Sequence, residues 1–198
     1  MDKVTIIMGL SGSGKSYLAQ TLLSKINIPF RYEADWGAVG NCDVDNKGNI
    51  QGSFTNDRRF KHLFNHIKKG MHVILDGAYF CNHKFLCEAE YYLNLHFPNI
   101  DITKYYFENN PKDAIANVLY RESANGNYWA EVNGELMFYG DHWVEEGPDL
   151  NRRSYEVIID NINKFTKNYI IPNKYTPLKI QVQDIRFYEG WKALIREE

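Results

Sequence analysis

The sequence predicts an α/β fold with a five-stranded, mostly parallel sheet and helices on both faces. Three observations predict it. Short apolar runs alternate with stretches of helical period along the 198 residues, a glycine-rich turn joins the first run to the first helix, and no internal repeat interrupts the rhythm. Because parallel strands need crossover connections, such alternation favours a parallel sheet covered on both sides.

Five stretches have the character of strands. The first is a nearly continuous apolar run, as expected for a strand buried on both faces. The others are short, rich in β-branched and aromatic residues, and separated by helical patterns. The predicted strands are Val4–Met8, Phe30–Ala34, His72–Asp76, Ile102–Phe107 and Leu178–Val182.

Five stretches have apolar residues at helical spacing. Gly70 ends the second, the third ends before Pro98, and the fourth begins at Asn110-Pro111, with proline at the first helical position. The apolar positions of the helices span Leu18–Ile26, Phe60–Ile67, Phe85–Leu93, Ile115–Leu119 and Tyr155–Phe165.

Composition excludes several classes of protein. Hydrophobic residues make up 44% of the chain and aromatic residues 15%, which is enough for a buried core and argues against disorder. With 23 basic and 25 acidic residues the formal charge is −2, so a nucleic-acid coat protein is not expected. The sequence has no run of 18 apolar residues and no signal peptide, so we expect no contact with a membrane.

The chain has three cysteines, at positions 42, 81 and 87, and none forms a CxxC pair. A small, odd number of cysteines suits reduced thiols better than a disulfide framework. We therefore expect a cytoplasmic protein.

The glycine-rich turn matches the pattern G-x-x-x-x-G-K-[ST], and it has the required strand before it and helix after it. Glycines let the backbone wrap around phosphate, and the exposed N–H groups and the helix N-terminus hold its oxygens. Lys15 then adds a positive charge at the β- and γ-phosphates, and the Ser16 hydroxyl is placed to bind Mg²⁺. The nucleotide-binding residues are Gly9, Leu10, Ser11, Gly12, Ser13, Gly14, Lys15, Ser16 and Tyr17.

Acidic residues follow two predicted strands, at the edge of the sheet where parallel α/β proteins bind ligands. Asp76 ends the strand HVILD, and we expect it to hold Mg²⁺ together with Ser16; the alternative is a turn residue paired with Gly77. Asp35 follows the second strand and could accept the proton of an attacking hydroxyl. Glu33 is the competing candidate for that base.

Two long segments interrupt the alternation of strands and helices. We expect an acceptor-side insertion over about residues 36–56, with a tight turn at Asn46–Asn49 rather than a calcium loop, and a lid-like region over about residues 121–153. Arg121 precedes the glycine-rich part of the lid, and Arg152 and Arg153 follow it. An arginine at such a position can stabilise the charge of a transferring phosphoryl group, and pairing with Glu122 or Asp149 is the alternative.

A further predicted feature is a cluster of basic residues on one helix. Its positive residues flank and occupy the helix around residues 60–67, where they could meet a phosphorylated substrate or a nucleic-acid end; a solvated helix face is the other interpretation. They are Arg58, Arg59, Lys61, Lys68 and Lys69.

With these features the chain resembles the P-loop kinase superfamily, in particular its polynucleotide-kinase-like and zeta-toxin-like branch. The resemblance covers about residues 3–168, and it is carried by the Gly9–Ser16 loop, Asp35, the sequence around Asp76 and the stretch from Tyr105 through Pro111 to Arg121. It implies the three-layer P-loop nucleoside-triphosphate hydrolase/kinase fold in a single domain, residues 1–198, with Mg²⁺ and ATP bound. The polynucleotide kinases of that branch have an arginine three residues after the base, where this chain has Ala38.

The expected function is ATP-dependent transfer of the γ-phosphate to a hydroxyl on a nucleotide, a nucleic acid (a 5′ end or a hydroxymethylated base) or a small metabolite. No guanine-reading Asn/Thr-Lys-x-Asp motif is present, which favours ATP over GTP. Two other possibilities stay open: a nucleotide-binding switch or hydrolase without an acceptor, and an accessory protein without turnover. The oligomeric state cannot be predicted.

Overall fold

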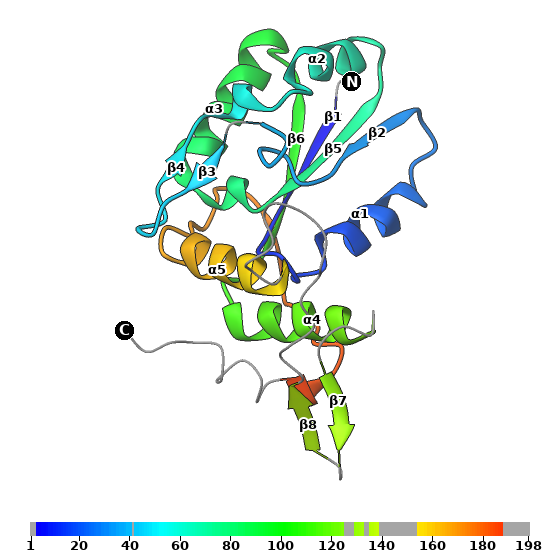
Figure 1. Cartoon of the computed structure of the whole chain (residues 1–198). Coiled ribbons are helices and arrows are strands. Elements are labelled where there is room, and N and C mark those ends of the chain that lie inside the picture. The colour runs from blue at the N-terminus through cyan, green and yellow to red at the C-terminus, as the bar shows by residue number, and fades with distance from the viewer. Residues whose placement is uncertain (1–2, 41, 125–128, 133–134, 139–153, 188–198) are drawn as a thin grey trace.

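The computed structural model describes residues 3–40, 42–124, 129–132, 135–138 and 154–187. Over these residues the chain is an α/β protein whose largest sheet has five strands, all parallel, in the order β2-β5-β1-β6-β9 (Figure 1). The strands are β1 (Lys3–Met8), β2 (Phe30–Glu33), β5 (His72–Gly77), β6 (Asp101–Phe107) and β9 (Thr176–Leu178). The predicted α/β class and parallel sheet are confirmed, and the architecture is compatible with the expected three-layer fold.

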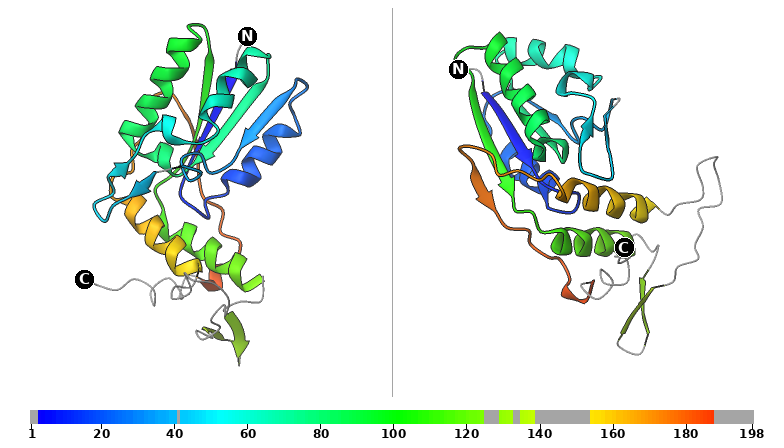
Figure 2. Two further views of the ribbon diagram at one scale, coloured as in Figure 1. Left: turned by 45° about the horizontal axis from the view of Figure 1, so that its top comes forward. Right: turned by 90° about the vertical axis from the view of Figure 1, so that its left-hand side faces the viewer.

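Helices flank this sheet. They are α1 (Lys15–Leu23), α2 (Phe60–Lys68), α3 (His83–His96), α4 (Pro111–Ala124) and α5 (Ser154–Thr166). The connection through α1 crosses the sheet in one direction, from β1 to β2, whereas those through α2 and α3 cross in the other direction. Right-handed crossovers therefore place α1 on the opposite face from α2 and α3, and Figure 2 shows α2 and α3 together on one face.

The central strands are apolar because both of their faces are covered. Five of the six residues of β1 are buried, as are all six of β5, and the two strands pair with Ile7 opposite Asp76. The carboxyl ends of β1, β2 and β5 therefore meet at one edge of the sheet. The glycine-rich loop and Asp35 follow these ends, and Asp76 is the last residue but one of β5.

The fifth strand differs from the prediction. It covers Thr176–Leu178 instead of Leu178–Val182, and it pairs with the end of β6 at the edge of the sheet, where Pro177 is tolerated. The chain leaves the sheet after Leu178, because the side chain of Asn117 on α4 binds the carbonyl of Gln181 and the N–H of Gln183. The apolar residues of 178–182 thus belong partly to a connection that packs against α4.

The segment of residues 36–56 contains a two-stranded hairpin, β3 (Asp43–Val44) and β4 (Ile50–Gln51). The tight turn expected at Asn46–Asn49 is confirmed, and the Asp45 carboxylate stabilises it by accepting the N–H groups of Lys47 and Asn49. The segment also contributes to the core, since the completely buried Trp36 stacks on Phe54 with ring centroids 5.4 Å apart.

The lid-like region is described only in part. Beyond the end of α4 it includes a second hairpin, β7 (Trp129–Val132) paired with β8 (Glu135–Phe138). Arg152 and Arg153 lie outside the described residues. No helix in the described part of the chain has an apolar stretch that could cross a membrane.

Candidate active site

The glycine-rich loop joins β1 to α1, and its backbone conformation depends on glycine. Gly12 and Gly14 have φ angles of 84° and 100°, in the left-handed region that side chains disfavour. A Cβ atom on Gly12 would lie 2.1 Å from the carbonyl oxygen of Ala114, so α4 packs directly against the loop. Gly14 caps the N-terminus of α1, which leaves the first N–H groups of that helix facing the space above the loop.

Lys15 is the first residue of α1, and it is 6% exposed. Its ammonium group donates to the carbonyl of Leu10 at 3.0 Å, across the loop. Among the described residues no carboxylate pairs with it. A buried cation without a carboxylate partner is costly, and an anion bound beside it would remove that cost.

Another polar group of the loop, the Ser13 hydroxyl, has no hydrogen-bond partner in the part of the chain that the structure describes. The Ser13 hydroxyl is, among the described side chains, the one buried polar group without a hydrogen bond, and it lies 2.4 Å from where a Cβ on Gly9 would be. Ser13 does not line the pocket beside the loop, so the fit of the loop to a phosphate rests on the left-handed glycines and on the buried Lys15.

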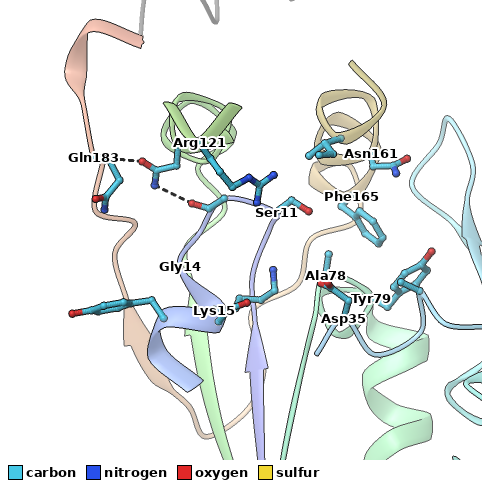
Figure 3. Close-up of a pocket in the computed structure, with 16 residues that line it drawn as sticks. Ser11, Gly14, Lys15, Asp35, Ala78, Tyr79, Arg121, Asn161, Phe165 and Gln183 are labelled. Atoms are coloured by element: carbon cyan, nitrogen blue, oxygen red, sulfur yellow. Dashed lines mark hydrogen bonds between the residues drawn. The ribbon is translucent and has the colours of Figure 1, made fainter. Parts of the chain in front are cut away.

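Residues of the loop line a pocket of about 510 Å³. Figure 3 shows Lys15 and Ser11 between two ends, one with Gln183 and the other with Asp35, Tyr79 and the side chains around them. The lining residues are Ser11, Gly12, Gly14, Lys15, Ser16, Tyr17, Asp35, Ala38, Ala78, Tyr79, Asn117, Arg121, Ile158, Asn161, Phe165 and Gln183. The structure thus brings the loop, Asp35 and Arg121 to one cavity.

Asp76 is the last residue but one of β5, close to its predicted place at the strand end, but it is completely buried and does not line the pocket. Its Oδ1 accepts the N–H of Asp35 at 2.7 Å, its Oδ2 accepts the hydroxyl of Tyr32 at 2.6 Å, and its carbonyl accepts the N–H of Trp36 at 2.6 Å. Burial and the hydrogen bond to Asp76 raise the pKa of Tyr32, and a hydrogen-bonding contribution from Ser16 acts in the opposite direction. The Tyr32 hydroxyl thus fixes the Asp76 carboxylate at the end of β5.

The described side chains do not form a Mg²⁺ site without further ligands. In the described residues no three Asp, Glu, His or Cys side chains form a metal site by themselves. Ser16 lines the pocket, where its hydroxyl suits an ion that takes most of its ligands from phosphate oxygens and water, as Mg²⁺ commonly does. Asp76 is completely buried with both carboxylate oxygens hydrogen-bonded, and it does not reach the pocket in this structure.

Asp35 is exposed and lines the pocket, and its φ angle of 48° is strained for a residue with a side chain. Hydrogen bonds from the surrounding turns hold it in this conformation. Its N–H binds Asp76, and its carbonyl accepts the N–H of Ala38 at 3.0 Å and a guanidinium N–H of Arg59 at 3.3 Å. The backbone is fixed while the carboxylate is left to face the pocket.

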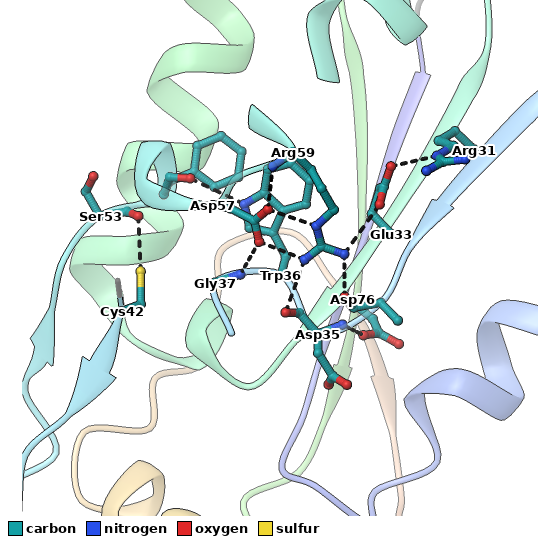
Figure 4. A network of polar contacts seen from close by, with 12 residues as sticks. Arg31, Glu33, Asp35, Trp36, Gly37, Cys42, Ser53, Asp57, Arg59 and Asp76 are labelled. Atoms are coloured by element: carbon teal, nitrogen blue, oxygen red, sulfur yellow. Dashed lines mark hydrogen bonds and ion pairs between the residues drawn. The ribbon is translucent and has the colours of Figure 1, made fainter. Parts of the chain in front are cut away.

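Glu33, the competing base, lies elsewhere. It is 6% exposed and accepts hydrogen bonds from Arg31 at 2.6 Å and Arg59 at 3.3 Å, and it does not line the pocket (Figure 4). The geometry therefore favours Asp35 over Glu33.

Arg59 does not belong to the exposed basic face on which the sequence placed it. It binds the buried Asp57 carboxylate at 2.7 Å, and its guanidinium carbon lies 5.0 Å from the centre of the Trp36 ring. Burial would raise the pKa of Asp57, but hydrogen bonds from Arg59 and from the Gly37 N–H outweigh it and hold that pKa below its ordinary value. The remaining residues of the predicted face, Arg58, Lys61, Lys68 and Lys69, are exposed.

Arg121 lies on α4 and lines the pocket together with the glycine-rich loop, and its role beside the phosphates stays a prediction. Asn117 lies one helical turn before Arg121 on α4, and the sequence did not predict it as a site residue. Its amide donates to the carbonyls of Gly12 and Gln181, both at 2.9 Å, and its carbonyl accepts the Gln183 N–H at 2.9 Å. It ties the glycine-rich loop to the segment after β9, a link between positions too far apart in sequence to be read from a local pattern.

No protein-family model matches the chain, and a search of curated proteins finds no similar sequence. The functional argument therefore rests on the residues of the site.

Proposed function

We propose that the protein is an ATP-dependent P-loop kinase that transfers the γ-phosphate to a hydroxyl group of an acceptor. One observation carries the proposal. The buried, carboxylate-free Lys15 at the glycine-rich loop and the exposed carboxylate of Asp35 line the same pocket of about 510 Å³. A phosphate at the loop and an acceptor beside Asp35 would share one cavity, as transfer between them requires.

Each residue has a role in this proposal. The loop N–H groups and Lys15 hold the β- and γ-phosphates, and Arg121 offsets charge on the transferring group. Asp35 accepts the proton of the acceptor hydroxyl while the oxygen of that hydroxyl forms a bond to the γ-phosphorus. The bond from that phosphorus to the β–γ bridging oxygen breaks, and the products are ADP and a phosphorylated acceptor.

Ser16 and Asp76 would hold Mg²⁺, which when bound neutralises charge on the phosphate oxygens. Their own contribution is positional. Tyr32 and the Asp35 N–H fix the Asp76 carboxylate at the end of β5, next to β1, whose end leads into the loop.

The pocket also bears on the rival functions. A switch or hydrolase needs groups for nucleotide and water only, whereas the lining of this pocket also includes Tyr79, Asn161 and Phe165, which lie apart from the glycine-rich loop. These side chains would be available to an acceptor, which supports the kinase.

A transfer assay tests the proposal. The protein is incubated with Mg²⁺ and γ-labelled ATP over nucleosides, mononucleotides, DNA ends and DNA with hydroxymethylated bases, and labelled products are separated. We expect label on at least one acceptor. Release of label as inorganic phosphate alone, with every acceptor tried, would favour the hydrolase instead.

A further inference from the structure

The end of the pocket beyond Asp35 differs in character from the phosphate end. Its side chains come from the turns after β2 and β5 and from α5, and Figure 3 shows them grouped on one side of Lys15. We call this group the acceptor wall. Its labelled members are Asp35, Ala78, Tyr79, Asn161 and Phe165.

The aromatic part of the wall is held in place before any ligand binds. The Tyr79 and Phe165 rings meet edge to face, with centroids 5.0 Å apart. The Tyr79 hydroxyl donates to the carbonyl of Cys42 at 3.1 Å, and the ring lies so close to Gly37 that a Cβ there would be 2.9 Å from it. Burial raises the pKa of Tyr79 to about 12, so this hydroxyl stays neutral near neutral pH.

The described side chains of the acceptor wall include an acidic group and no basic one. Among the wall's members Asp35 alone has a carboxylate, and the basic residues that line the described pocket, Lys15 and Arg121, lie outside the wall. Arg59 approaches Asp35 from behind, and its charge is already paired with Asp57 and Glu33. A second phosphate on the acceptor would thus face the Asp35 carboxylate, with no cation among the described residues of the wall to bind it.

Asn161 supplies the remaining polar group. A side-chain amide both donates and accepts hydrogen bonds, so it can pair with the edge of a ring that carries nitrogen and oxygen atoms. Rigid aromatic surface with one or two such polar groups is how proteins usually hold a planar, uncharged ligand.

We infer that the acceptor is an uncharged alcohol that carries a flat heteroaromatic ring, for which nucleosides are the natural class. This inference rests on the proposed function, because it assumes that the acceptor hydroxyl meets Asp35. The sequence alone did not distinguish between several classes of acceptor. The inference favours a nucleoside over a nucleotide, a nucleic-acid end or a ring-free metabolite.

The test compares matched acceptors under Mg²⁺ and γ-labelled ATP. Nucleosides are compared with their 3′-monophosphates, which keep the 5′-hydroxyl but add charge, with 5′-hydroxyl oligonucleotides, and with ribose, which lacks the ring. We expect kcat/KM for a nucleoside to exceed each of the other values at least tenfold. Equal or better use of the 3′-monophosphate, the oligonucleotide or ribose overturns the inference and leaves the proposed kinase standing. Release of inorganic phosphate alone, with every acceptor, overturns both.

A variant links the result to the wall. Phe165→Leu removes the ring but keeps apolar volume, so we expect the nucleoside KM to rise about tenfold while the KM for ATP is unchanged. Phe64→Leu, which changes a half-buried ring on α2 outside the pocket, is the matched control and should alter neither value. An unchanged nucleoside KM in Phe165→Leu contradicts the stacking role. If that variant fails to fold, the acceptor series with the unmodified protein still decides.

Discussion

The backbone N–H of Asp35 donates to Oδ1 of Asp76 at 2.7 Å, so one buried acidic residue fixes the position of an exposed one. The φ angle of 48° at Asp35 costs about 1 kcal/mol, and the hydrogen bond to Asp76 is one of those that offset this strain. The end of β2 is thereby joined to the end of β5. The residue proposed to hold Mg²⁺ and the proposed base are mechanically coupled, which affects how variants at either position should be interpreted.

Asp76→Asn should lower phosphoryl transfer by about a hundredfold or more, the equivalent of a few kcal/mol of lost charge stabilisation. Asparagine keeps the Oδ1 acceptor for the Asp35 N–H, so the turn should persist while the negative charge is lost. Transfer rates measured against Mg²⁺ concentration check this. An unchanged Mg²⁺ dependence would make Asp76 a turn residue only.

Asp35→Asn should suppress transfer strongly while ATP still binds, because in the proposed arrangement the carboxylate faces the acceptor and not the nucleotide. Transfer kinetics and equilibrium binding of ATP, measured on the same variant, separate the two effects. Glu33→Gln is the control, since Glu33 lies in an ion-pair network outside the pocket. A large loss of transfer in Glu33→Gln with normal transfer in Asp35→Asn would reverse the assignment.

Asp57→Asn should lower the free energy of unfolding by about 3 kcal/mol, because it leaves Arg59 without its closest carboxylate. The pKa of Asp57 in the folded protein lies below its ordinary value of 3.8. The ionised carboxylate therefore contributes stability above about pH 4, and this contribution is lost as the pH falls through the lowered folded pKa. Denaturant unfolding of both proteins between about pH 3 and 7 checks it. A stability difference that does not shrink at the acid end would contradict this account.

Tyr32→Phe should lower the free energy of unfolding at neutral pH by about 1 kcal/mol, since the buried Asp76 loses a hydrogen bond. The pKa of Tyr32 is raised above 10.0 in the folded protein, so its contribution is complete below about pH 10 and is lost as the pH rises further. Unfolding curves at rising pH should therefore converge for the two proteins. A gap that stays constant above pH 10 would mean that folding does not raise the pKa of Tyr32.

Strong local patterns predicted most of the fold. The ends of the predicted strands of β1, β5 and β6 differ from the observed ends by one residue at most, because buried apolar runs bounded by turns leave little choice. The fifth strand was misplaced since its limits depend on Asn117, a residue about sixty positions earlier. Helix α1 ends at Leu23 although the apolar pattern continues to Ile26, which lies in the turns that follow.

The sequence predicted those parts of the candidate site whose residue types and spacing form a local pattern. That holds for the glycine-rich loop, and the strand-end position of Asp35 led to its placement at the pocket. Tyr32, Asn117 and Phe165 were missed because each reaches the site through contacts across the fold, and a lone tyrosine, asparagine or phenylalanine carries no local signal. Arg59 was misassigned for the same reason, since its partners Glu33 and Trp36 lie more than twenty residues away in sequence.

The central claim is that Lys15 holds the phosphates of ATP for transfer to a hydroxyl. The most direct measurement is labelled γ-phosphate transfer by Lys15→Ala beside Lys25→Ala, which removes an exposed lysine just beyond the end of α1. Circular dichroism and thermal unfolding first establish that both variants are folded. We expect transfer to be abolished in Lys15→Ala and unchanged in Lys25→Ala. Near-normal transfer by a folded Lys15→Ala protein would contradict the account.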